Sequence, residues 1–181
     1  MLMLGTHKPR HPTAISPSNQ IRASILPWMR SNLSCTRMAH LHKSAVTLRI
    51  SGDDLIPDEI SRLLGASPTD AQTRCDKIVG KKTGHVRIAK WGMWRLCAPD
   101  REPEDMDGQI QEILSQATGD LAVWLSITKE YHADLFCGLF MRVGNEGLTI
   151  SSQSLAALGA RGIEMGLDIY KGNDDEEETS S

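Results

Sequence analysis

The sequence predicts an α+β domain in which an antiparallel or mixed sheet carries its helices on one face. Short apolar stretches with strand-like alternation are separated by stretches with helical spacing of apolar residues. The succession strand, helix, strand occurs twice, over residues 46–50, 56–66 and 69–74, and again over residues 134–141, 150–160 and 163–170. The full order favours a ferredoxin-like split β-α-β arrangement extended by one α-β unit.

The first strand and helix are the clearest elements. Residues 46–50 alternate apolar and polar side chains, which is typical of a strand with one buried face. Pro57 suits the first turn of the following helix, because its missing N–H would be unpaired there in any case. Gly65 is placed as its left-handed cap, and Pro68 prevents continuation.

The remaining elements follow from the same signals. Residues 76–90 are basic and contain glycines, which indicates a mobile connection or a hairpin arm. Strand 135–141 is apolar on both faces and is therefore expected at the centre of the sheet. Ser151 and Gly159 are expected to begin and end the last helix. The other expected elements are a strand at 93–98 and helices at 106–116 and 121–131.

Several side chains are expected in the core. Leucines on the apolar faces of their elements should be buried, namely Leu64, Leu114, Leu139 and Leu158. Trp94 should point inward, and Cys97 and Cys137 should be small core residues of apolar strands. No Cys-x-x-Cys pair and no secretory signal are present, so the cysteines are expected to be reduced thiols of a cytoplasmic protein.

The charge distribution suggests three segments. Residues 46–171 form the single α+β domain, and residues 172–181 form an acidic, disordered tail. Residues 1–45 are interpreted as a disordered or misannotated N-terminal leader, with translation starting at Met1 or Met38. The leader contains no acidic residue, whereas residues 174–178 are all acidic.

Composition excludes several classes of protein. The chain has 181 residues, 40% hydrophobic content and a net charge of −3, which argue against a strongly basic nucleic-acid binder and a mostly disordered chain. Asp53 and Asp54 fit a turn, and the His40/His42 pair lacks the third ligand of a zinc site. The sequence therefore assigns no catalytic residue, metal ligand or cofactor, and no membrane association.

A basic, aromatic cluster provides the candidate binding residues, which are Lys81, Lys82, Arg87, Lys90, Trp91 and Arg95. Tryptophan and arginine are enriched in protein interfaces, which favours a non-catalytic protein–protein interaction module of accessory or immunity-like type. The same residue types could stack on bases and hold phosphates, so a nucleic-acid-binding module using residues 77–95 is an alternative. A small-ligand regulatory domain is a third hypothesis.

The order of motifs also resembles a known family. The segments 48–54 (LRISGDD), 57–65 (PDEISRLLG), 94–96 (WRL), 135–140 (LFCGLF) and 167–170 (LDIY) together resemble the uncharacterised bacterial domain family 4279, a domain of unknown function. The resemblance covers residues 46 to about 171. It implies a bacterial, cytoplasmic, single-domain protein and assigns no catalytic residue.

Overall fold

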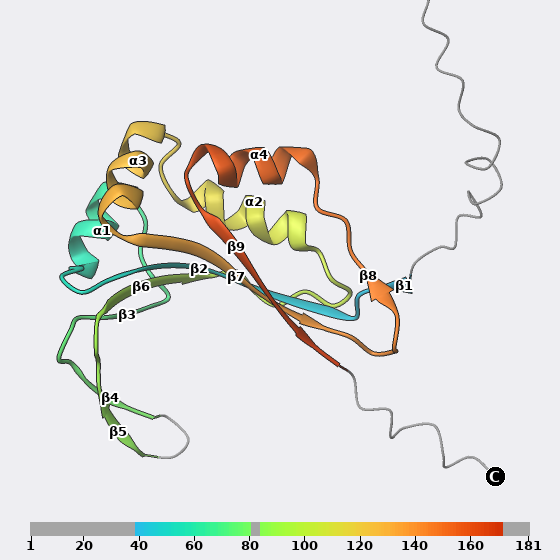
Figure 1. The fold of residues 1–181 in the computed structure, drawn as a ribbon, viewed down its shortest axis with the longest axis horizontal. Helices are drawn as coiled ribbons and strands as arrows, with labels where there is room; N and C mark the ends of the chain where they lie inside the picture. The colour runs from blue at the N-terminus through green and yellow to red at the C-terminus, as the bar shows by residue number, and fades with distance from the viewer. Residues whose placement is uncertain (1–38, 81–83, 172–181) are drawn as a thin grey trace, which may run out of the picture. The chain divides into compact units, whose positions relative to one another are not determined.

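A five-stranded mixed sheet forms the centre of the protein (Figure 1). The computed structural model describes residues 39–80 and 84–171. The strands of the sheet are β2 (Lys43–Gly52), β3 (Asp70–Gln72), β6 (Gly92–Cys97), β7 (His132–Phe140) and β9 (Glu164–Tyr170). Their spatial order is β3-β6-β2-β7-β9, and every neighbouring pair is antiparallel except the parallel pair β7–β9.

The helices all lie on one face of this sheet, as the sequence predicted (Figure 1). They are α1 (Pro57–Leu64), α2 (Met106–Gln116), α3 (Leu121–Glu130) and α4 (Ser152–Ala160). Helix α1 connects β2 to β3, and β6 lies between these two strands in the sheet. Helices α2 and α3 connect β6 to β7, and β2 lies between these two strands. This is the predicted split β-α-β arrangement, and α4 with β9 forms the additional α-β unit. No helix in the described residues is long and apolar enough to cross a membrane.

The core lies between the sheet and the helices. Along β2 the side chains of Val46, Leu48 and Ile50 are buried, as their alternation predicted. Trp94 is fully buried, and its indole Nε1 donates a hydrogen bond to Ser61 Oγ at 3.0 Å. The prediction that Trp94 belongs to the core is therefore confirmed.

The four leucines expected in the core differ in burial. Leu64, Leu139 and Leu158 are buried, whereas Leu114 is only partly buried at the margin of the core. Leu114 lies in the last turn of α2, next to fully buried Ile113. The helical periodicity correctly predicted that Leu114 faces the core, but its prediction that the side chain is buried was wrong.

The sequence Leu-Gly-Ala occurs at residues 64–66 and again at residues 158–160, and the two copies differ in structure. Gly65 ends α1 in the left-handed region with φ +65°, as predicted. Gly159 lies within α4, which continues to Ala160, and the left-handed residue is Gly162 with φ +67°. The expectation that Gly159 ends the helix was therefore wrong.

The sheet extends further toward the N-terminus than the sequence indicated. Strand β2 begins at Lys43, and β1 (Ala39–His40) pairs in parallel with β8 (Glu146–Gly147). Residues 39–40 and 43–45, which the sequence analysis placed in the leader, thus take part in strands. The rest of the expected leader and the expected acidic tail lie outside the described residues.

A small hairpin follows β3. Strand β4 (Lys77–Val79) pairs antiparallel with β5 (Val86–Ile88), on the side of the sheet away from the helices (Figure 1). The sequence predicted either a mobile connection or a hairpin arm for this segment, and the structure shows the hairpin. We call residues 77–91 the arm.

Candidate functional site

The face of the sheet that carries no helix is charged. One side chain from each strand forms a row across it, in the order Asp70, Arg95, Arg49, Asp134 and Glu164. Because cross-strand neighbours lie close together, the two adjacent arginines need compensating acids. Each has one: Arg95 pairs with Asp70, and Arg49 pairs with Asp134.

The Arg49–Asp134 pair is bidentate. Arg49 Nε lies 3.0 Å from Asp134 Oδ1, and Nη2 lies 2.5 Å from Oδ2. The guanidinium carbon also lies 4.5 Å from the centre of the Phe136 ring, which supports the pair from below. The hydrogen bond to Asp134 raises the pKa of Arg49, against the opposing effect of burial. This arginine is thus held in place and largely neutralised.

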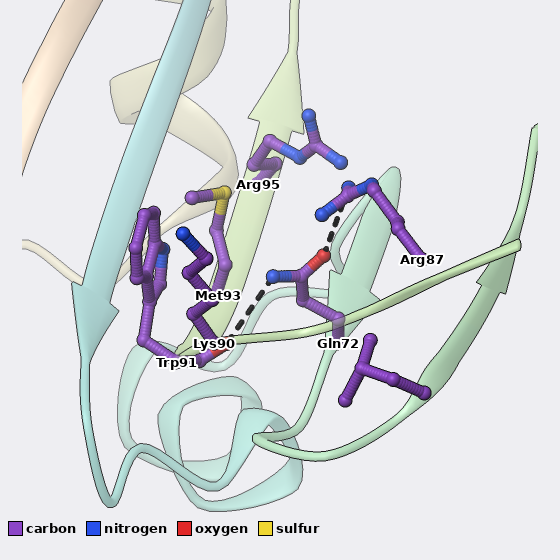
Figure 2. Close-up of a pocket in the computed structure, with 7 residues that line it drawn as sticks. Gln72, Arg87, Lys90, Trp91, Met93 and Arg95 are labelled. Atoms are coloured by element: carbon purple, nitrogen blue, oxygen red, sulfur yellow. Dashed lines mark hydrogen bonds between the residues drawn. The ribbon is translucent and has the colours of Figure 1, made fainter.

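Beside this row lies a pocket of about 370 Å³, drawn in Figure 2. It is lined by Gln72, Arg87, Ile88, Lys90, Trp91, Met93 and Arg95. Four of the six predicted binding residues therefore meet in one recess, although they come from β5, β6 and the turn between these strands. The other two, Lys81 and Lys82, lie outside the described residues.

Gln72 joins the arm to the sheet. Its Nε2 donates a hydrogen bond to the carbonyl of Trp91 at 3.2 Å, and its Oε1 accepts one from Arg87 Nη2 at 3.4 Å. Figure 2 shows Arg87 on one side of the recess and Trp91 on the other, with Lys90 and Met93 between them. Sequence reasoning missed Gln72, since only the pairing of β3 with β6 brings it opposite Met93.

The arm exposes apolar side chains as well as cations. Val79, Val86, Ile88 and Trp91 are 60%, 52%, 52% and 43% exposed, respectively. On the opposite face of the hairpin, Ile78 turns toward the sheet and is half-buried. Each of its strands has only three residues, so the hairpin itself cannot bury this apolar surface.

A second cavity, of about 640 Å³, lies between the arm and the helix-free face of the sheet. Its walls come from the arm and from β2, β6 and β7, and it shares Arg87 and Arg95 with the first pocket. The Arg95 Nε is buried and has no hydrogen-bond partner among the described residues. Aromatic and aliphatic groups complete the lining, with Phe136 and Ile78 among them.

The histidines and carboxylates elsewhere in the described part of the chain form no metal centre. His40 and His42 pair with different glutamates, with His40 Nδ1 3.7 Å from Glu104 and His42 Nε2 3.4 Å from Glu102. In residues 39–80 and 84–171 there is no group of three histidine, cysteine, aspartate or glutamate side chains that could hold a metal ion.

Cys97 and Cys137 lie on opposite faces of the sheet. Cys137 is buried, and burial together with the Asp134 charge raises the pKa of its thiol to about 12. It therefore remains a protonated core residue rather than a nucleophile. Cys97 is exposed, and the expectation that it lies in the core was wrong, because β6 directs Trp94 and Leu96 to the helices and Cys97 to the opposite face.

The arrangement can bind a ligand that is both anionic and apolar. Arg87 bonds to the neutral amide of Gln72, whereas the charges of Arg49 and Arg95 are compensated by paired carboxylates. Trp91 and Ile88 provide apolar contact area beside it.

Searches among curated proteins and among solved structures found no match. A family comparison matches residues 40–172, which is most of the chain and all of the sheet and helices described above, and the family is described as a domain of unknown function, DUF4279. This agrees with the resemblance indicated by the order of sequence motifs. The chain therefore belongs to the DUF4279 family.

Proposed function

We propose that this domain is a non-catalytic protein–protein interaction module that engages its partner with the arm. The observation that carries the proposal is the exposure of Val79, Val86, Ile88 and Trp91 on the arm. Contiguous exposed apolar surface of this kind is typical of interaction sites, because it gains free energy when a partner covers it.

The charges of the arm define the partner's chemistry. Arg87 and Lys90 line the same pocket as Ile88 and Trp91. A matching segment would present apolar side chains flanked by Asp or Glu, so that attraction orients the encounter while the aromatic anchor supplies affinity. Such a module suits a cytoplasmic accessory or immunity-like protein.

The nucleic-acid alternative is less well supported. Arg49 and Arg95 already pair with carboxylates, and the whole chain has a net charge of −3. Both features reduce the attraction of this face for a polyphosphate.

The test of the main proposal begins with site-specific photo-crosslinking in the native host. A crosslinking amino acid at Val86 should capture a partner, and one at Leu125, a 60% exposed residue of α3, should not. Affinity for the recovered partner is then measured by calorimetry. Trp91→Ala should weaken it about 30-fold or more, since a buried aromatic anchor is worth about 2 kcal/mol. Equal crosslinking from both positions would contradict the proposal.

Charge variants separate the protein and nucleic-acid readings. Arg87→Ala with Lys90→Ala should mainly slow association with a protein partner, with less effect on dissociation than Trp91→Ala. If single-stranded RNA or DNA is the ligand, anisotropy titrations should show tight, salt-sensitive binding. Replacing Lys81, Lys82 and Arg87 together should then lower the salt slope by up to about 3. That result would overturn the protein-interface proposal.

The larger cavity supports one second candidate, a small-ligand regulatory domain. Its volume of about 640 Å³ is in the usual range for ligand sites. Arg87 and the Phe136 ring, which both line this cavity, suit a carboxylate or phosphate attached to an apolar group. A thermal-shift screen of such anions tests this candidate. A stabilising anion whose effect disappears with Phe136→Ala would favour ligand regulation over partner binding.

A further inference from the structure

Among the strands that the structure describes, β9 forms one edge of the sheet. It pairs with β7, and no other described strand lies on its far side. Proteins commonly protect such edges with short strands, prolines or lysines. The opposite edge strand, β3, has only three residues, whereas β9 has seven and contains neither proline nor lysine. The β9 edge is therefore long enough to pair with another strand.

The backbone groups that point outward can be assigned. Met141 N–H donates to the Tyr170 carbonyl at 2.9 Å, so the backbone groups of Tyr170 point toward β7. Because these groups alternate in direction along a strand, those of Met165, Leu167 and Ile169 point away from β7. These three residues present unpaired N–H and C=O groups at the edge.

The same three residues carry the apolar side chains of the strand. Leu167 lies opposite buried Cys137 in the sheet and thus shares its helix-side face. Leu167 and Ile169 are nevertheless 49% and 60% exposed, since the helices do not cover this edge. On the other face, Tyr170 stacks on Phe140 with ring centres 4.8 Å apart.

We propose that β9 pairs antiparallel with β9 of a second copy of this chain, about a two-fold axis at Leu167. The two sheets then form one continuous sheet. Met165 of each copy faces Ile169 of the other, so all three outward residues of both copies form backbone hydrogen bonds. The exposed leucine and isoleucine side chains are buried against their counterparts.

Charge selects this register over its neighbours. With Leu167 on the axis, Glu164 faces Tyr170 and Asp168 faces Gly166, so no acid opposes another acid. A shift of two residues in one direction places Asp168 opposite Asp168 of the second copy. A shift in the other direction places Glu164 opposite Asp168. Like charges directly opposite one another destabilise a strand pair, and both shifts also leave one outward residue unpaired.

This inference is independent of the proposed function, because the arm follows β3 near the other edge of the sheet. The first measurement is the mass of the full chain by light scattering after gel filtration. We expect a species of twice 19.9 kDa. A wild-type chain that stays monomeric at concentrations where a Kd of about 10 µM would be detected overturns the proposal.

Charge variants test the register. Leu167→Lys places two ammonium groups on the axis and should weaken the dimer about 30-fold or more. Leu125→Lys, at the 60% exposed position on α3, is the matched control and should leave the dimer intact. Leu167→Asp should also be monomeric, and a mixture of the Lys and Asp variants should restore a heterodimer. A dimer that resists Leu167→Lys, or two variants that do not associate when mixed, would contradict the two-fold register.

A crosslinking variant covers the case in which charged variants do not fold. Leu167→Cys should form an intermolecular disulfide under mild oxidation, because the two side chains meet on the axis. The parent protein and Leu125→Cys are the controls, since Cys75 and Cys97 are already exposed. Crosslinking no greater than in these controls would overturn the proposal.

Discussion

A buried glutamine offers a sharp test of how the sheet and the helices are joined. Gln109 in α2 is fully buried, and its amide bonds to two separate segments. Its Oε1 accepts a hydrogen bond from Ser44 Oγ at 2.6 Å, and its Nε2 donates to the carbonyls of Ser44 at 3.2 Å and Pro99 at 2.8 Å. Gln109→Met keeps the approximate volume and removes all three bonds, so it isolates their contribution.

The expected destabilisation follows from the groups left without partners. The Ser44 carbonyl keeps its bond from the Arg101 N–H at 3.0 Å, so it is not orphaned. The Pro99 carbonyl loses the donor that Gln109 provides. The Ser44 hydroxyl loses its acceptor, although its oxygen still accepts a hydrogen bond from the Asp105 N–H at 3.3 Å. An unsatisfied buried polar group costs about 1–3 kcal/mol, so Gln109→Met should lower the free energy of unfolding by about 2–4 kcal/mol.

Urea denaturation followed by circular dichroism measures this change, and a double-mutant cycle assigns it. Ser44→Ala alone should cost about 1–2 kcal/mol, because it leaves the Gln109 oxygen without its donor. The double variant Ser44→Ala/Gln109→Met should be more stable than the sum of the single effects by about 1 kcal/mol. A Gln109→Met change below about 0.5 kcal/mol, or strictly additive effects, would refute the reasoning.

Three further predictions concern individual side chains. Ellman's reagent should modify exposed Cys97 in the native protein but reach Cys137 only on unfolding, because burial raises the pKa of that thiol to about 12; early labelling of Cys137 in a peptide map would argue against this. Burial raises the pKa of Asp107, but hydrogen bonds from serines, chiefly Ser154, outweigh it and lower the pKa below 3.8. The stability that the ionised carboxylate gives the folded protein is therefore present above pH 3.8 and is lost as the pH falls through the lowered pKa. Acid titrations of stability should therefore be flatter below pH 3.8 for Asp107→Asn than for the parent. Leu64→Ala should cost about 2–5 kcal/mol in the same urea assay, and a mild effect would question the packing of α1 on the sheet.

Local patterns predicted most of the fold because most elements are locally consistent. Pro57 and Gly65 mark the ends of α1, and the alternation of residues 46–50 marks the centre of β2. The start of β2 could not be predicted, since Lys43 and Ser44 are polar. Ser44 is buried only because Gln109, 65 positions away, bonds to it. Such a partner becomes visible only in the folded chain.

The sequence predicted which residues belong to the candidate site, but not the contacts that bring them together. A cluster of cations beside two tryptophans is visible in the sequence, and Arg87, Lys90, Trp91 and Arg95 do line one pocket. The sequence does not show that Gln72 joins β3 to the arm, because that contact depends on the strand order.

The distribution of charge on the helix-free face favours the arm, rather than the centre of the sheet, as the proposed recognition surface. Arg49 and Asp134 are 85 positions apart in sequence, yet they form a bidentate pair, and Arg95 is paired with Asp70. Breaking either pair to bind a ligand would cost the free energy of leaving a carboxylate unpaired. Arg87 bonds only to a neutral amide among its described contacts, so a partner's carboxylate could replace that bond with a stronger, charge-assisted one. Recognition of an anionic group at the arm therefore has a lower cost than recognition at the centre of the sheet.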